Sequence, residues 1–148
     1  MKEVRTEIQI GASSQRVWQV LTDFARYPEW NPFIQDISGI LEPESRLKIL
    51  IRTPRGKTRS YEPLITKLVP ESELRWVGKG MLPGLLDGEH IFSIKPLDAH
   101  NVLFVQSEIF NGLLVSMFGK RLDKEIRQGF EEMNEAMKRM IEKEKTFG

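Results

Sequence analysis

Residues 115–145 have the period of one long helix, and this feature limits the possible folds more than any other. Apolar residues recur there at steps of three and four, as on one helical face: Leu122, Ile126, Phe130, Met133, Met137 and Met140. A helix of about 30 residues is about 45 Å long, enough to cross a whole curved sheet. The rest of the chain must therefore supply a sheet against which this helix buries its apolar face.

The residues before this helix predict consecutive β-strands. Turn signals rich in Pro, Gly, Asp and Asn separate runs with strand character. The predicted strands span 35–41, 46–53, 58–69, 73–80, 86–96 and 101–110. Because short connections join them, they favour an antiparallel meander.

The N-terminal residues add a seventh strand, because Val4, Thr6, Ile8 and Ile10 share one face of the segment 3–10. A first amphipathic helix follows, with its apolar face formed by Val17, Val20, Leu21 and Phe24. Ser13 or Ser14 offers the capping hydroxyl. Tyr27-Pro28 interrupts this helix, since the residue before proline disfavours helical geometry. Residues 29–33 then form an aromatic turn or a second helical stub.

This order of elements predicts an α+β fold with a seven-stranded curved antiparallel sheet wrapped around the long C-terminal helix. The length of 148 residues fits a single domain, 1–148. A curved sheet that grips a helix without touching it everywhere leaves a cavity between the two layers. We expect an internal cavity.

Composition excludes several classes of protein. The absence of cysteine rules out disulfides and thiolate chemistry, and the net charge of +1 steers the chain toward neither nucleic acid nor an anionic membrane. The longest apolar run, Val102 to Val105, is far shorter than the roughly 20 residues of a membrane span. We expect a soluble cytoplasmic protein, a monomer or weak homodimer. A basic group at Arg52, Arg55, Lys57 and Arg59 indicates either a solvated hairpin tip or a phosphate-binding patch.

Several segments resemble one known family. They are residues 10–18, 24–33, 74–78, 88–92 and 106–112. Together they resemble the START-like (SRPBCC superfamily) proteins of the polyketide cyclase/dehydrase group. The resemblance implies the helix-grip fold, with two short helices after the first strand. It implies no single reaction, because relatives bind sterols, polyketides, hormones or partner proteins on this scaffold.

His90 and Glu108 are the most informative polar residues. In a hairpin that turns at 98–100, His90 opposes Glu108 and Phe92 opposes Gln106. Directly opposed side chains have β-carbons about 4.5–5.5 Å apart. The sequence therefore predicts a histidine and a carboxylate within reach of each other.

A different hairpin register is also possible. A loop one residue longer or shorter places Ser107 or Ile109 opposite His90 and turns Glu108 outward. That register also has an apolar core face, formed by Leu103, Val105 and Ile109. The resemblance favours the first register, because it groups His90, Phe92, Gln106, Glu108 and Phe110.

Three roles are open to a buried His90–Glu108 pair. It orients a polar group of a ligand, it transfers protons in a cyclisation or dehydration, or it is a hydrogen-bonded pair that satisfies itself. These two residues are the only catalytic candidates, and binding is favoured over catalysis. The predicted ligand-binding residues are Trp30, Phe33, Trp76, His90, Phe92, Gln106, Glu108 and Phe110. For each aromatic residue, core packing is an alternative explanation.

Other residues carry weaker predictions. Asn31 is a turn residue or a pocket donor, and Gly129 gives close approach or cavity space on the long helix. The methionines of that helix line either a cavity or a packed core. Residues 112–119 and 81–86 form a cavity entrance, a docked helix start or a dimer contact.

No phosphate-binding loop, paired-histidine zinc motif or nucleophile elbow is present, so we expect no metal and no cofactor. The favoured function is binding or transport of an apolar small molecule, such as a lipid, a polyketide-like or an aromatic compound. One alternative is a cyclase, aromatase or dehydratase that uses His90 and Glu108. Another is a protein-interaction module resembling START-like activators of chaperone ATPases.

Overall fold

The computed structural model describes residues 1–79, 87–113 and 115–147, without the side chains of 79, 118, 119, 122 and 145–147. The elements in chain order are β1 (Lys2–Ile10), α1 (Ser14–Thr22), the 3₁₀ turn η1 (Phe24–Arg26), α2 (Tyr27–Trp30), β2 (Ile34–Ser38), β3 (Lys48–Arg52), β4 (Thr58–Tyr61), β5 (Leu64–Val69), β6 (Glu73–Lys79), β7 (Asp87–Asp98), β8 (Asn101–Asn111) and α3 (Val115–Phe147). The predicted α+β helix-grip fold is confirmed.

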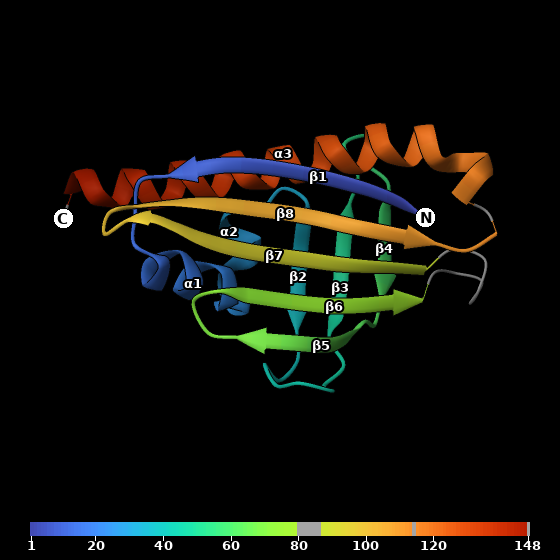
Figure 1. The fold of residues 1–148 in the computed structure, drawn as a ribbon, viewed down its shortest axis with the longest axis horizontal. Helices are drawn as coiled ribbons and strands as arrows, with labels where there is room; N and C mark the ends of the chain where they lie inside the picture. Colours follow the sequence, from blue (N-terminus) through green and yellow to red (C-terminus); the bar gives the residue numbers. More distant parts are fainter. Residues whose placement is uncertain (80–86, 114, 148) are drawn as a thin grey trace.

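The strands form two antiparallel sheets rather than one. The larger has the order β1-β8-β7-β6-β5 and the smaller the order β2-β3-β4, and the smaller sheet crosses behind the larger (Figure 1). The predicted count of seven strands is wrong, because the predicted strand 58–69 divides into β4 and β5. Pro63 lies at the break and has no N–H to donate to a ladder. Its carbonyl instead accepts a hydrogen bond from the Leu47 amide at 2.9 Å.

The β7–β8 register is the first of the two registers considered. His90 pairs with Glu108, and Phe92 pairs with Gln106. The turn is fixed by Asp98, whose carboxylate accepts from the His100 amide at 2.8 Å. The alternative register, with Glu108 turned outward, is wrong.

The helices after β1 form where predicted, but their bounds differ. Helix α1 ends at Thr22, so Phe24 lies in η1 and not on the first helix. The predicted interruption at Tyr27-Pro28 is wrong, because Tyr27 keeps helical geometry and begins α2. The Ser13 hydroxyl caps α1 by accepting from the Arg16 amide at 3.2 Å. The helical stub begins at Tyr27, earlier than the predicted 29–33, and Pro28 occupies its first turn, where no N–H partner is needed.

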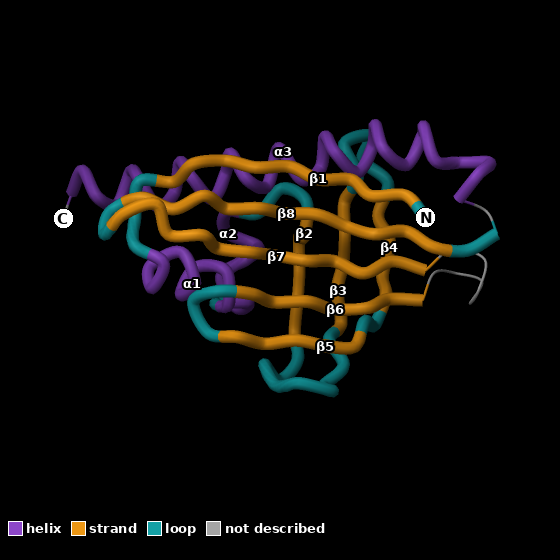
Figure 2. The backbone as a smooth tube through the Cα atoms, viewed as in Figure 1, coloured by secondary structure: helices purple, strands orange, loops and turns teal. Residues whose placement is uncertain are grey.

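The long helix α3 lies along β1 (Figure 2). Its buried face includes Phe130, Met133 and Met137, so these methionines belong to the packed core. The predicted contribution of Leu122 lies outside the described side chains. A β-carbon added at Gly129 would lie 2.5 Å from a ring carbon of Phe33, so this glycine allows that ring to approach the helix.

The basic group 52–59 lies on the β3–β4 hairpin, as the hairpin-tip interpretation predicts. Gly56 turns there with φ of 85°. Arg55 at the tip forms an ion pair with Glu125 at 3.6 Å. The phosphate-binding alternative stays a prediction.

Candidate ligand site at the Glu108 end of the large sheet

An aromatic cluster occupies the inner face of the large sheet. The ring of His90 stacks on Phe92 with centroids 4.4 Å apart and lies 5.1 Å from Trp76. Phe130 of α3 covers the imidazole at 4.9 Å. Because all four side chains are buried, this part of the space between sheet and helix is filled by packed rings.

A chain of buried hydrogen bonds, called here the polar chain, links the imidazole to α3 and β1. His90 Nε2 lies 2.9 Å from Gln106 Oε1, and Gln106 Nε2 donates to Asn134 Oδ1 at 2.8 Å. Asn134 Nδ2 donates to Thr6 Oγ1 at 3.0 Å, and the Thr6 hydroxyl donates to the Gln106 carbonyl at 2.9 Å. The polar chain therefore ties β7, β8, α3 and β1 together.

Sequence reasoning did not select Thr6 or Asn134 as site residues. Each is a polar residue inside an apolar stripe: Thr6 lies between Val4 and Ile8, and Asn134 follows Phe130 by one helical turn. A polar residue on a buried face needs a partner, so this interruption of the stripe is the signal that identifies both.

His90 and Glu108 come together, but not as a direct hydrogen bond. His90 Nδ1 lies 3.6 Å from Glu108 Oε1, which is an ion-pair distance and too long for a hydrogen bond. Within the described part of the chain, Nδ1 is buried without a hydrogen-bond partner. The close partner of the imidazole is Gln106, so one ring nitrogen is satisfied and the other is not.

Two glycines open the inner face beside this pair. Gly78 on β6 is directly opposite Gly88 on β7. A β-carbon added to Gly78 would lie 3.0 Å from the Tyr61 ring, and one added to Gly88 would lie 3.3 Å from the Glu108 carboxyl. The glycines thus make room for these two side chains, and the four residues are called here the Glu108 end.

Water reaches the Glu108 end. The side chain of Glu108 is 14% exposed, whereas that of His90 beside it is only 1% exposed. The inner face therefore changes from buried to partly solvated between two directly paired residues.

Tyr61 and Trp76 complete the surroundings of the carboxylate. Burial raises the pKa of the Tyr61 phenol, the Glu108 carboxylate raises it further, and the Trp76 indole N–H opposes them. Trp76 Nε1 is itself buried without a partner of hydrogen-bond geometry among the described residues. The site thus places two unpartnered polar atoms, a carboxylate and a neutral phenol next to an aromatic wall, which suits contact with a polar atom of an apolar molecule.

The model of the family "Polyketide cyclase / dehydrase and lipid transport" matches residues 1–143. The chain belongs to this family. No curated protein matches this family member.

Solved structures agree in fold at low sequence identity. A START superfamily protein from Mycobacterium smegmatis is 19% identical with a TM-score of 0.77, covering 97% of this chain and 99% of that one. A norcoclaurine synthase mutant from Thalictrum flavum, solved with a transition-state analogue, is 13% identical with a TM-score of 0.74, covering 97% and 96%. The di-domain ARO/CYC protein BexL is 13% identical with a TM-score of 0.73, over 92% of this chain. This family member spans about half of that protein, 46% of its length.

Two further predicted ligand-binding residues, Phe33 and Phe110, lie near the aromatic cluster. Phe33 packs edge-on against Phe130, with ring centroids 5.6 Å apart. Phe110 is buried on β8 directly opposite Gly88. Both are therefore near the aromatic cluster, Phe33 through Phe130 and Phe110 through the strand pairing.

Trp30 lies apart from this cluster in the described contacts. It is half-buried and packs against Tyr27 with ring centroids 5.2 Å apart. Asn31 accepts from the amides of Phe33 and Ile34 at 2.9 and 2.8 Å, so the turn interpretation of Asn31 is confirmed. The ligand-binding role of Trp30 stays a prediction.

The predicted entrance is described only in part. Residues 81–86 lie outside the described residues, as does Leu114, and the Phe118 side chain is not described. Leu113 and Met117 are strongly exposed, whereas Val115 is buried. The entrance, docking and dimer interpretations stay predictions.

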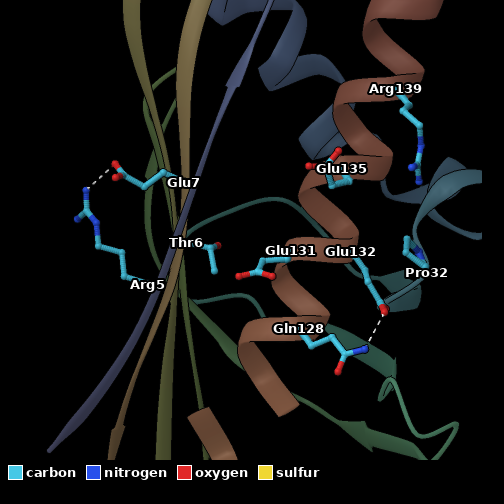
Figure 3. A pocket seen from close by; sticks show the side chains of 9 residues that line it. All are labelled: Arg5, Thr6, Glu7, Pro32, Gln128, Glu131, Glu132, Glu135 and Arg139. Carbon is cyan, nitrogen blue, oxygen red and sulfur yellow. Dashed lines mark hydrogen bonds and ion pairs between the residues drawn. The ribbon is translucent and has the colours of Figure 1, made fainter. Parts of the chain in front are cut away.

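A surface hollow of about 810 Å³ is lined by residues of β1, of α3 and of the segment between α2 and β2 (Figure 3). Its lining residues are Arg5, Thr6, Glu7, Pro32, Gln128, Glu131, Glu132, Glu135 and Arg139. Charged side chains dominate this lining, and it includes none of the eight predicted ligand-binding residues. The hollow is therefore distinct from the apolar cavity expected between sheet and helix.

Among the described residues, no helix carries an apolar stretch long enough to cross a membrane. No group of three His, Asp or Glu side chains gathers there as a metal site would require.

Proposed function

We propose that this chain binds an apolar small molecule whose polar end lies at the Glu108 end of the large sheet. Three buried side-chain polar atoms lack a hydrogen-bond partner among the described residues: Asn31 Nδ2, Trp76 Nε1 and His90 Nδ1. The observation that carries the proposal is that two of them, His90 Nδ1 and Trp76 Nε1, lie together in aromatic surroundings. Buried polar atoms of proteins are nearly always satisfied, and a site that awaits a ligand is one reason for exceptions.

The surroundings support the same proposal. Ligand sites are mostly apolar with a few placed polar groups, and here Trp76, Phe92 and Phe110 supply buried apolar surface near one imidazole. The partly exposed Glu108 marks the side from which the ligand enters. Membership of a family of cyclases, dehydrases and lipid transporters agrees with an apolar ligand.

The first test asks whether the purified protein carries a ligand. We expect native mass spectrometry to show a bound mass above that of the chain, and solvent extraction to release an apolar compound. The fluorescent probe ANS should bind and be displaced by the extracted compound.

The two histidines of the chain provide a test variant and its control. We expect His90→Leu to weaken binding at least tenfold, and His100→Leu, in the exposed turn, to leave it unchanged. Equal affinity of both variants would contradict the site. A chain without bound mass that takes up no apolar probe would contradict the function and favour a protein-interaction module.

A cyclase or dehydratase is the second candidate. The observation that favours it is the distance of 3.6 Å between His90 Nδ1 and Glu108 Oε1, which places two groups that can each take up and release a proton within one small movement of each other. We expect Glu108→Gln to keep the extracted compound bound but to abolish its conversion. Glu89→Gln, on the outer face where Glu89 pairs with Arg75, is the control. Parallel loss of binding and conversion would argue against proton transfer.

A further inference from the structure

One backbone carbonyl fixes which group donates and which accepts in every hydrogen bond of the polar chain. The carbonyl of Gln106 can only accept, so the Thr6 hydroxyl donates its single proton there. Thr6 Oγ1 is then an acceptor for the Asn134 amide, and Asn134 offers its oxygen to Gln106. Gln106 in turn can present only its oxygen to His90.

This order of donors and acceptors fixes the protonation of the imidazole. His90 Nε2 faces Gln106 Oε1 at 2.9 Å, and two acceptors cannot share that contact without a proton, so Nε2 carries the hydrogen. In a neutral ring the other nitrogen then bears a lone pair. The unpartnered Nδ1 beside Glu108 is therefore an acceptor.

We propose that Thr6, Asn134 and Gln106 are positioning residues for His90, and that the ligand carries a neutral hydroxyl at its polar end. The hydroxyl donates to His90 Nδ1, and its oxygen accepts from Trp76 Nε1. The two rings that carry these atoms have centroids 5.1 Å apart. This inference rests on the proposed function and names its ligand class.

Other polar ends fit this pair of atoms less well. A methyl ether has no proton for Nδ1, and a hydrocarbon leaves both atoms unsatisfied. A carboxylate adds a negative charge next to Glu108, which is a repulsive contact. An alcohol or phenol offers one donor and one acceptor without charge, so it satisfies both atoms.

The tautomer is tested on the unmodified protein. Long-range proton–nitrogen NMR of the histidine rings, at about pH 8 and thus above the ordinary histidine pKa of about 6.5, separates the two nitrogens. We expect His90 to show a protonated Nε2 and an unprotonated Nδ1. A ring protonated at Nδ1, alone or together with Nε2, would overturn the inference.

A threonine pair tests the positioning role. In Thr6→Val the hydroxyl is lost, so we expect the His90 signals to report a mixture of tautomers, and Thr6→Ser to restore the single tautomer. Thr22→Val removes a hydroxyl that also donates to a carbonyl, that of Trp18, and should leave His90 unchanged. Retention of one Nε2–H tautomer in Thr6→Val would show that Thr6 is merely structural.

The ligand class is tested with four probes of one skeleton: naphthol, naphthyl methyl ether, naphthoic acid and naphthalene. We expect naphthol to bind at least tenfold more tightly than the ether and the acid. In Thr6→Val the preference for naphthol over the ether should fall to less than about threefold. The reason is that His90 then adopts both tautomers, and only one of them offers Nδ1 as an acceptor to the hydroxyl. Binding of all four with equal affinity would overturn this inference and leave the proposed function standing. Binding of none would overturn both.

Discussion

The two halves of the β7–β8 hairpin belong to one hydrogen-bonded ladder, but the side chains on their inner faces differ in polarity. Near the turn, Ile94, Val102 and Phe104 are at most 3% exposed and contribute only apolar atoms to the inner face. Toward the other end, the same face carries His90 with an unpartnered nitrogen and the partly solvated Glu108. The first half is a purely apolar core, whereas the second half combines packed rings with polar atoms.

This difference separates stability from function. Apolar side chains in close contact stabilise a fold, whereas an unpaired buried polar atom costs free energy. Residues that break the local packing rule mark functional positions, because folding alone does not favour them. We therefore expect changes in the turn half to alter unfolding and changes at the Glu108 end to alter binding.

The largest expected effect belongs to the turn half. Phe104→Ala should lower the free energy of unfolding by about 3–5 kcal/mol, because it leaves a cavity at a fully buried position. Glu108→Ala, on the same strand, should lower it by less than about 1 kcal/mol. Urea denaturation measures both, and equal losses would break the comparison between the halves.

The contact between Gly129 and Phe33 gives the next largest effect. Gly129→Ala should destabilise by about 1–3 kcal/mol, because the new methyl group would lie 2.5 Å from the ring. Intrinsic helix propensity alone predicts that Gly129→Ala stabilises the fold by about 1 kcal/mol. The sign of the measured change in the free energy of unfolding therefore distinguishes the two effects. Gln128→Ala is the exposed control, and Phe33→Leu combined with Gly129→Ala should recover part of the loss. A stabilised Gly129→Ala variant would contradict the close approach.

An alkaline transition gives a smaller effect at the Glu108 end. Because the pKa of Tyr61 in the folded chain is raised, mainly by burial, stability is full below the ordinary phenol pKa of about 10 and falls above it. The unfolded chain ionises first. Tyr61→Phe should reduce this loss by up to about 1.4 kcal/mol per pH unit. Tyr27, whose pKa burial also raises, provides the matched variant Tyr27→Phe. Tyrosinate absorbance from the native chain near pH 10 would contradict the shift.

The smallest effect on stability is expected at Trp76. Trp76→Phe loses volume but also removes an unpartnered buried N–H, so unfolding should change by less than about 1 kcal/mol. The preference for naphthol over its methyl ether should stay, while naphthol itself binds less tightly. Calorimetry of both probes checks this, and unchanged naphthol affinity would remove Trp76 from the site.

The sequence by itself determined most of the elements and one hairpin. The period of residues 115–145 predicts α3 almost to its ends. The short turn at 98–100 predicts the β7–β8 hairpin, with His90 opposite Glu108 in one of two possible registers. These features depend on residues close in the chain. A repeat of two or 3.6 residues, together with a turn, is enough to define them.

Tertiary structure alone decided the long-range contacts of the site. The hydrogen bond from Asn134 to Thr6 joins residues 128 positions apart, and Tyr61 reaches Gly78 only because the chain bends at Pro63 into a second sheet. Short-range sequence patterns do not predict such contacts, because the contacts depend on how a helix and two sheets pack. The sequence thus predicted a hairpin in which a histidine and a glutamate can meet, while packing decided that Gln106 binds the histidine and that Nδ1 has no partner among the described residues.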